Sequence, residues 1–229
     1  QLAHCCYPHG NDVRGRENDV RARRSDIENF PYLCTKLMTM KQEENQFLME
    51  YEERLTRVLL QQFTDAQMLE GELLAVEELE EKWNSSAAEY MAAAVPQLND
   101  YPAAAVAWAA YMGIGSAILW ETAWDNYQDV DDLYTPIASP RGFDEMDEYV
   151  MEEMLGYALE DEEATRLENL LRAASATALT MIRKEGIEAQ SVMAFYIFAR
   201  SAKVFFRLGV SVGLRLLGYR YHKTKMDVN

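Results

Sequence analysis

An uncharged segment near the middle of the chain constrains the fold most. Residues 101–120 read YPAAAVAWAAYMGIGSAILW and contain no Asp, Glu, Lys or Arg. An alanine-rich helix of this length needs apolar surroundings over its whole circumference, which either protein or lipid can supply. The segment therefore predicts a central helix around which the other parts of the chain are organised.

Lipid is the less favoured environment for this segment. Alanine, its commonest residue, contributes little transfer free energy compared with leucine or isoleucine. Residues 83–140 contain no Lys or Arg that could anchor the segment at a membrane interface. A second apolar stretch, at residues 187–221, carries three bases near its middle, and each would be costly in a bilayer. We therefore expect two core helices of a soluble, cytoplasmic protein without a membrane partner.

The composition predicts an all-α fold. Residues that favour helices dominate, and the 229-residue chain has only 6 Pro and 11 Gly to interrupt them. Apolar residues recur at helical spacing in several further segments, and none alternates as a strand does. We predict a single bundle of about six helices. Two of them, at about 101–130 and 187–221, are expected to be central and apolar.

Four amphipathic helices are expected around the central pair. Their predicted ranges are 41–63, 64 to just before Pro96, about fourteen residues from Asp144, and 161–184. The first helix would turn inward Phe47, Tyr51, Leu55, Val58 and Leu59. The second would start at Thr64, because Gln67 follows three residues later as in a capping box. The fourth helix of the chain would bury Met146, Tyr149, Val150, Met154 and Tyr157.

The first forty residues differ in composition from the rest. Residues 1–40 are rich in Arg, Asp and Asn, poor in Leu and Ala, and show no sustained period. We expect an atypical N-terminal extension, flexible or non-native, in front of a single all-helical domain at 41–229. A natural start at Met38 or Met40 would agree with this change in composition.

Cysteine and histidine are almost confined to this extension. All three cysteines, Cys5, Cys6 and Cys34, lie within it, so the body of the chain uses no disulfide, as in a reducing compartment. His4 and His9 flank the first two cysteines. Adjacent cysteines converge poorly on one zinc ion, so we predict no zinc site there.

The charge distribution argues against nucleic acid as a partner. The formal net charge is -16, and residues 41–189 alone hold 32 acids and 9 bases. Binding to a phosphate backbone requires a basic footprint, which this acidic body lacks. The surplus of acid is typical of a well-solvated helical surface.

Two acidic stripes could hold a metal ion. If the helix that begins at residue 101 continues to Asp132, then Glu121, Asp125, Asp129 and Asp132 project from one side of it. A second stripe on the helix from Asp144 comprises Glu145, Glu148 and Glu152. Mg²⁺ and Mn²⁺ prefer such oxygen ligands. The metal ligands would be Glu121, Asp125, Asp129, Glu148 and Glu152.

A basic stripe offers a different role for the acids. Arg200, Lys203 and Arg207 are spaced three and four residues apart in an otherwise apolar helix. Partly buried charges need partners, since leaving one unpaired costs several kcal/mol. We name Glu121 and Asp125 as the candidate partners. Structural ion pairing is favoured over metal binding.

Three aromatic residues continue the central helix beside the acidic stripe. Trp120, Trp124 and Tyr127 are spaced four and three residues apart. They could line a pocket for an apolar or cationic ligand. Core packing is the commoner role of such a stripe.

The favoured function is a non-enzymatic helical interaction or scaffold module, acting on a protein partner or by self-association. Outside the extension the chain has one histidine, His222, so nucleophilic triads lack their base. Twelve methionines suit adaptable contact surfaces. No cofactor is expected on this hypothesis. The alternative is a Mg²⁺- or Mn²⁺-dependent carboxylate enzyme acting on a phosphate-containing small molecule.

Overall fold

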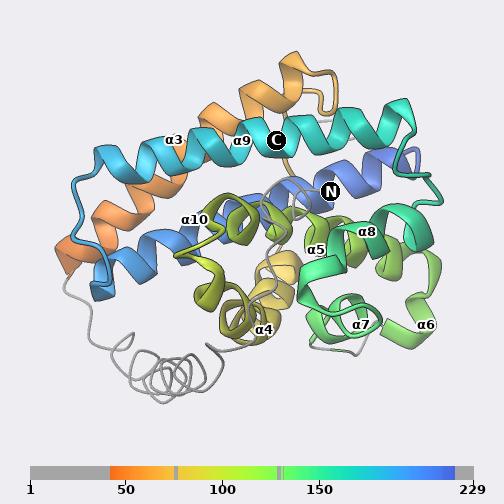
Figure 1. Cartoon of the computed structure of the whole chain (residues 1–229), viewed down its shortest axis with the longest axis horizontal. Coiled ribbons are helices and arrows are strands. Elements are labelled where there is room, and N and C mark those ends of the chain that lie inside the picture. Colours follow the sequence, from red (N-terminus) through yellow and green to blue (C-terminus); the bar gives the residue numbers. More distant parts are fainter. Residues whose placement is uncertain (1–41, 75–76, 128–129, 131, 220–229) are drawn as a thin grey trace, which may run out of the picture.

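The computed structural model describes residues 42–74, 77–127, 130 and 132–219, and every regular element within these ranges is helical (Figure 1). This confirms the all-α bundle that the sequence predicts. The expected N-terminal extension, with Met38 and Met40, lies outside the described residues, as do the three cysteines.

Five long helices form the body of the described part. They are α3 (Gln42–Asp65), α4 (Glu77–Ala94), α5 (Pro102–Thr122), α9 (Glu162–Lys184) and α10 (Val192–Leu216). Short helical elements connect them: η2 (Val95–Gln97), α6 (Trp124–Tyr127), α7 (Tyr134–Ala138), η3 (Phe143–Glu145), α8 (Met146–Tyr149) and the π-helix η4 (Val150–Met154). In Figure 1, α3 and α9 run along one side of the central helices, and α4 and α7 lie on the other.

Two helices, α5 and α10, are central, as the uncharged and apolar stretches predict. Every residue from Ala104 to Ile118 in α5 is buried. Among the described helices, α5 is the one long and apolar enough to cross a membrane, judged by length and composition alone. In its most apolar window, 83% of the residues are buried inside the protein. The surroundings of this segment in the structure are therefore largely protein.

Glycine allows the backbones of the two central helices to touch. A Cβ atom added at Gly209 of α10 would lie 2.0 Å from the carbonyl oxygen of Ala110. One added at Gly113 of α5 would lie 2.2 Å from the carbonyl oxygen of Phe206. Real Cβ atoms do not approach backbone so closely, so a larger residue at either position would force the helices apart.

Helix α3 covers the central pair with a regular apolar face. Its buried residues are Leu48, Tyr51, Leu55, Leu59 and Phe63. The sequence prediction placed this face slightly differently, because Val58 is 40% exposed and Phe47 is only partly buried. A stripe that follows i, i+3 and i+4 spacing leaves one neighbouring position on the border of the face, and packing decides which position turns outward.

The second amphipathic helix begins later than the capping box predicts. Thr64 remains inside α3, where its hydroxyl donates a hydrogen bond to the carbonyl oxygen of Leu60 at 2.7 Å. Gln67 has φ 59° and Gly71 has φ 84°, so the chain turns through the left-handed region twice before α4 starts. The buried side chain of Leu69 ties this turn to the core.

The central helix α5 ends at Thr122, short of the predicted residue 130. Ala123 leaves the helical conformation, with φ −137° and ψ 38°, and α6 is a separate turn. Lys82 Nζ donates a hydrogen bond to the carbonyl oxygen of Val130 at 2.6 Å and fixes the following segment against α4. The predicted acidic stripe along one helix from Glu121 to Asp132 is therefore wrong. Asp132 instead accepts hydrogen bonds from the first backbone N–H groups of α7.

The segment from Phe143 to Met154 is not one continuous α-helix, although the sequence pattern predicts one. It passes from a 3₁₀ turn through one α turn into a π-helix. Its buried residues are Met146, Asp147, Val150 and Met151. Asp147 and Met151 are buried and Tyr149 is only half-buried, so the inward face differs from the prediction.

Replacing Gly209 by alanine tests the contact between the central helices. The added methyl group cannot fit beside the Ala110 backbone. We expect Gly209→Ala to lower the free energy of unfolding by about 3 kcal/mol, the upper end of overpacking costs. Urea unfolding followed by circular dichroism measures it.

The matched control is Gly115→Ala in α5. The three atoms nearest to its Cβ would all belong to the side chain of Ile137, the nearest at 3.0 Å, and none to the backbone. A helical alanine also gains about 0.5–1 kcal/mol over glycine, so we expect a stability within about 1 kcal/mol of the wild type. Equal losses in the two variants would contradict a backbone contact specific to Gly209.

Candidate functional site

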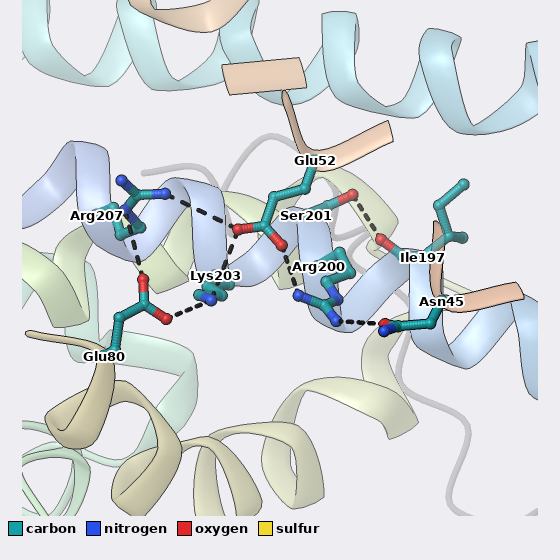
Figure 2. Close-up of polar contacts among 8 residues, drawn as sticks. All are labelled: Asn45, Glu52, Glu80, Ile197, Arg200, Ser201, Lys203 and Arg207. Carbon is teal, nitrogen blue, oxygen red and sulfur yellow. Dashed lines mark hydrogen bonds and ion pairs between the residues drawn. The ribbon is translucent and has the colours of Figure 1, made fainter. Parts of the chain in front are cut away.

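The most connected polar group of side chains in the described structure lies on one side of α10. Arg200, Lys203 and Arg207 point away from the apolar core of that helix toward two carboxylates (Figure 2). Figure 2 shows Glu52 of α3 and Glu80 of α4 approaching these bases from two sides. We call these five residues the ion-pair network.

Glu52 is the centre of the ion-pair network. Its Oε2 atom lies 2.7 Å from Arg200 Nη1, and its Oε1 atom lies 3.6 Å from Lys203 Nζ and 3.8 Å from Arg207 Nη1. Glu80 forms a close ion pair with Lys203, and its Oε1 atom lies 3.9 Å from Arg207 Nε. Three helices, α3, α4 and α10, are therefore joined through two carboxylates.

The network is partly removed from solvent. The Glu52 side chain is 13% exposed and that of Lys203 15%, whereas an ordinary surface ion pair is largely solvated. Beneath it, Tyr51 of α3 hydrogen bonds to the Ser201 hydroxyl at 2.9 Å, and Ser201 donates to the carbonyl oxygen of Ile197. Burial, opposed in part by this hydrogen bond, raises the pKa of Tyr51 to about 12, so the phenol stays protonated. Polar contacts therefore join α3 to α10 at two levels, in the partly exposed ion-pair network and in the buried hydrogen bond beneath it.

The partners of the basic stripe differ from those that the sequence prediction names. Glu121 accepts a hydrogen bond from the hydroxyl of Tyr219, which follows the C-terminal end of α10. Asp125 is exposed on the short helix α6. The bases instead pair with Glu52 and Glu80. Glu52 and Glu80 are two of many acids in the chain, and only their positions beside α10 in the folded structure identify them as partners. No pattern in the sequence predicts this pairing.

The two predicted acidic stripes do not meet in the described structure. Glu148 and Glu152 lie beside Arg141, whose Nη1 atom is 3.9 Å and 2.6 Å from their respective carboxylate oxygens. Asp129, the third predicted metal ligand of the first stripe, lies outside the described residues. Among the residues that are described, no group of three or more His, Cys, Asp or Glu side chains is arranged to hold a metal ion. Metal binding that involves Asp129 stays a prediction.

The predicted aromatic stripe is divided between two helices. Trp120 lies in α5 and Tyr127 in α6, because the chain leaves the helical conformation at Ala123. The ammonium group of Lys82 sits 5.3 Å from the centre of the Trp120 ring, as in a cation–π contact. The side chain of Trp124 lies outside the described part of the chain. Trp120 therefore helps to hold α4 against the end of α5.

Asp147 of α8 has a buried carboxyl group that the sequence analysis did not predict. It is 4% exposed and borders a cavity of about 20 Å³, the size of one water molecule. The residues that line this cavity are Tyr111, Asp147, Glu148, Met151, Leu159, Ala164 and Glu168. Periodicity arguments assign polar residues to the outside, so an acid on an inward face gives no signal in the sequence.

The surroundings of Asp147 favour its protonated form. Burial raises the pKa of its carboxyl group above the usual 3.8, and a hydrogen bond from the backbone N–H of Glu148 opposes part of this shift. Tyr111 faces the same cavity, and its pKa is raised well above 10.0 by burial first and then by the negative charge of Asp147. Asp147 is thus held at a position where its charge is costly.

Comparisons with known proteins leave the site to be interpreted from its own contacts. No protein-family model, no curated protein and no solved structure matches the chain. These contacts are ion pairs and hydrogen bonds, and the ion-pair network joins α3, α4 and α10.

Substituting Glu52 tests how much the ion-pair network stabilises the fold. Glu52→Gln leaves three bases with one carboxylate. Breaking a fully buried pair costs about 3–5 kcal/mol, and because these side chains keep some solvent we expect a loss of about 2 kcal/mol. Urea unfolding gives the value.

The neighbouring exposed acid Glu53 provides the control. Glu53→Gln should change the free energy of unfolding by less than about 0.5 kcal/mol. A double variant, Glu52→Gln with Arg200→Gln, should be less destabilised than the two single losses added together, because it removes one base along with its acid. If Glu52→Gln and Glu53→Gln behave alike, the network does not stabilise the bundle.

Proposed function

We propose that this chain is a non-enzymatic helical module that acts through contacts with another protein or with a second copy of itself. The observation that carries the proposal is the ion-pair network. Arg200, Lys203 and Arg207, three of the four charged residues of α10, are engaged by Glu52 and Glu80 in ion pairs between helices. Groups used in this way hold a scaffold together and are not presented to a substrate.

Four acids of the two predicted stripes have comparable partners. Glu148 and Glu152 flank Arg141, which comes from the loop before η3. Asp132 accepts hydrogen bonds from the backbone at the start of α7. Glu121 accepts one from Tyr219. These contacts give each of the four carboxylates a role in joining or capping helices, which supports a structural role.

The outer surface offers a charged face to a partner. The segment 41–189 contains 32 acids against 9 bases. Large apolar side chains that are exposed, such as Met49 at 47% and Val58 at 40%, are scattered along the outside of α3. Single exposed apolar residues are ordinary, so the acidic charge is the more distinctive property of the surface. A basic partner protein would be attracted to this acidic surface, and its association would weaken as salt is added.

Thermal unfolding with metal ions tests the proposal against the enzyme alternative. We expect the melting temperature to be the same in Mg²⁺, in Mn²⁺ and in EDTA. A metal bound only to the folded state at a hundred times its dissociation constant would add about 2.7 kcal/mol, a shift of a few degrees. A metal-dependent rise that disappears in Asp125→Asn would overturn the module and favour the carboxylate enzyme. Asp100→Asn, an exposed acid before α5, is the matched control.

Light scattering separates self-association from binding to another protein. The monomer has a mass of 26.3 kDa. If the chain acts on itself, the mass should rise toward the dimer with concentration, and salt should change the midpoint. A mass that stays at the monomer value over a hundredfold range of concentration would contradict self-association and assign the contact to another protein.

A further inference from the structure

A stripe of apolar and small residues runs along α10. Its members are spaced alternately three and four residues apart, so they share one side of the helix. In chain order they are Val192, Phe195, Ala199, Ala202, Phe206, Gly209 and Gly213. The members from Ala202 onward are buried, whereas the first three are only partly buried. We call the first three, Val192, Phe195 and Ala199, the N-terminal stripe.

The change in burial along the stripe coincides with the start of α5. Gly209 approaches Ala110, and Gly213 approaches Ala117, so the two central helices run in the same direction. Pro102, the first residue of α5, precedes Ala110 by eight residues and is therefore about level with residue 201 of α10. The first turns of α10 project beyond that level. Helix α5 covers the later part of the stripe and is too short to cover the N-terminal stripe.

The start of α3 lies at this same end of the bundle. The guanidinium group of Arg200 contacts Asn45 Oδ1 at 3.5 Å, and the next residue of α10, Ser201, hydrogen bonds to Tyr51. Figure 1 shows the orange beginning of α3 beside the beginning of α10. Asn45 is three residues from Gln42, the first residue of α3. The chain that precedes Gln42 is therefore tethered close to the N-terminal stripe.

The sequence that directly precedes α3 is apolar enough to cover this surface. Residues 30–40 read FPYLCTKLMTM and contain no Asp or Glu. Their large apolar side chains are Phe30, Tyr32, Leu33, Leu37, Met38 and Met40. Residues 10–29, by contrast, contain five arginines and no Leu, Met, Phe, Tyr or Trp. Apolar side chains are thus concentrated at the end of the N-terminal extension that is tethered beside the stripe.

We propose that residues 30–40 pack on the N-terminal stripe of α10 and complete the apolar face that α5 covers further along. The stripe is about 10 Å long, and eleven residues can span up to about 35 Å, so the segment reaches it easily. A short tether also gives the segment an effective concentration of about millimolar. On this inference the helical domain begins near residue 30, and residues 30–40 are part of its fold.

A second copy of the chain fits the N-terminal stripe less well. A standard interface between proteins covers about 800 Å² on each partner, which is far more than a stripe about 10 Å long offers. The tethered segment needs no such area, because its covalent link to α3 already supplies most of the entropy cost of association. The inference concerns this end of the bundle and does not depend on the partner contact proposed above.

Disulfide trapping in the full chain tests the inference, because Cys34 lies within residues 30–40. Replacing Cys5 and Cys6 by serine leaves Cys34 as the one native thiol. Val192→Cys and Ala199→Cys are then made singly, oxidised mildly and mapped by mass spectrometry of unreduced peptides. A disulfide requires Cα atoms within about 7 Å, so we expect an intramolecular bond from Cys34 to at least one of the two positions.

Gln46→Cys is the matched control. Gln46 is exposed and lies four residues from Gln42, so it is at least as close to the tether. We expect its disulfide with Cys34 to form about tenfold more slowly than the faster bond to the stripe. Equal rates, or the lack of a bond to either stripe position, would overturn the inference. A bond between two chains, seen as a dimer mass, would also overturn it and assign the stripe to a second copy.

Hydrogen exchange provides a second test that needs no new cysteine. In the full chain, Leu33→Asp with Leu37→Asp should lower the amide protection of residues 196–199 about tenfold, because burial of one leucine corresponds to at least that factor. Val13→Asp with Val20→Asp changes the part of the extension that is poor in apolar residues and should leave this protection unchanged. Equal protection in both double variants would contradict packing by residues 30–40.

Discussion

The backbone contact between α5 and α10 is the constraint on which the other parts of the structure depend. Gly113 and Gly209 allow the two helices to approach until a single methyl group would separate them. At this distance no larger side chain fits between the two helices at the contact, and their remaining faces need other helices to cover them. Helices α3, α4 and α9 then cover those faces, and their buried residues follow the spacing of an amphipathic helix.

The charges of α10 show how a helix at the centre of a bundle can carry bases without burying an unpaired charge. Arg200, Lys203 and Arg207 share one side of the helix, where their side chains keep some exposure to solvent. Glu52 and Glu80 close the gap and keep the bases half-buried. Asp147 is the contrasting case, because it lies deep beside α5 and its charge meets two further acids. One set of charges stabilises the bundle, and the other is held where burial makes its charge costly.

The accuracy of the sequence prediction varied with the range of the interactions involved. The range of α9 and the central position of α5 and α10 agree with the periodic pattern, because burial of a whole face determines them. The start at Thr64 failed because Gln67 and Gly71 take left-handed conformations that a capping box does not exclude. The stripe from Glu121 to Asp132 failed because the helix ends at Thr122. Local turns of this kind depend on what they pack against.

The sequence by itself determined that the chain is helical, that two apolar helices are central, and that the bases of one of them need partners. These properties depend on composition and on spacing along a single helix, which any neighbour must satisfy. Only the tertiary structure decided which acids serve as partners, that Glu121 and Asp125 do not, and that Asp147 is buried. Many acids in this chain are equivalent until the helices are placed side by side, because Coulomb attraction and desolvation depend on distances in space.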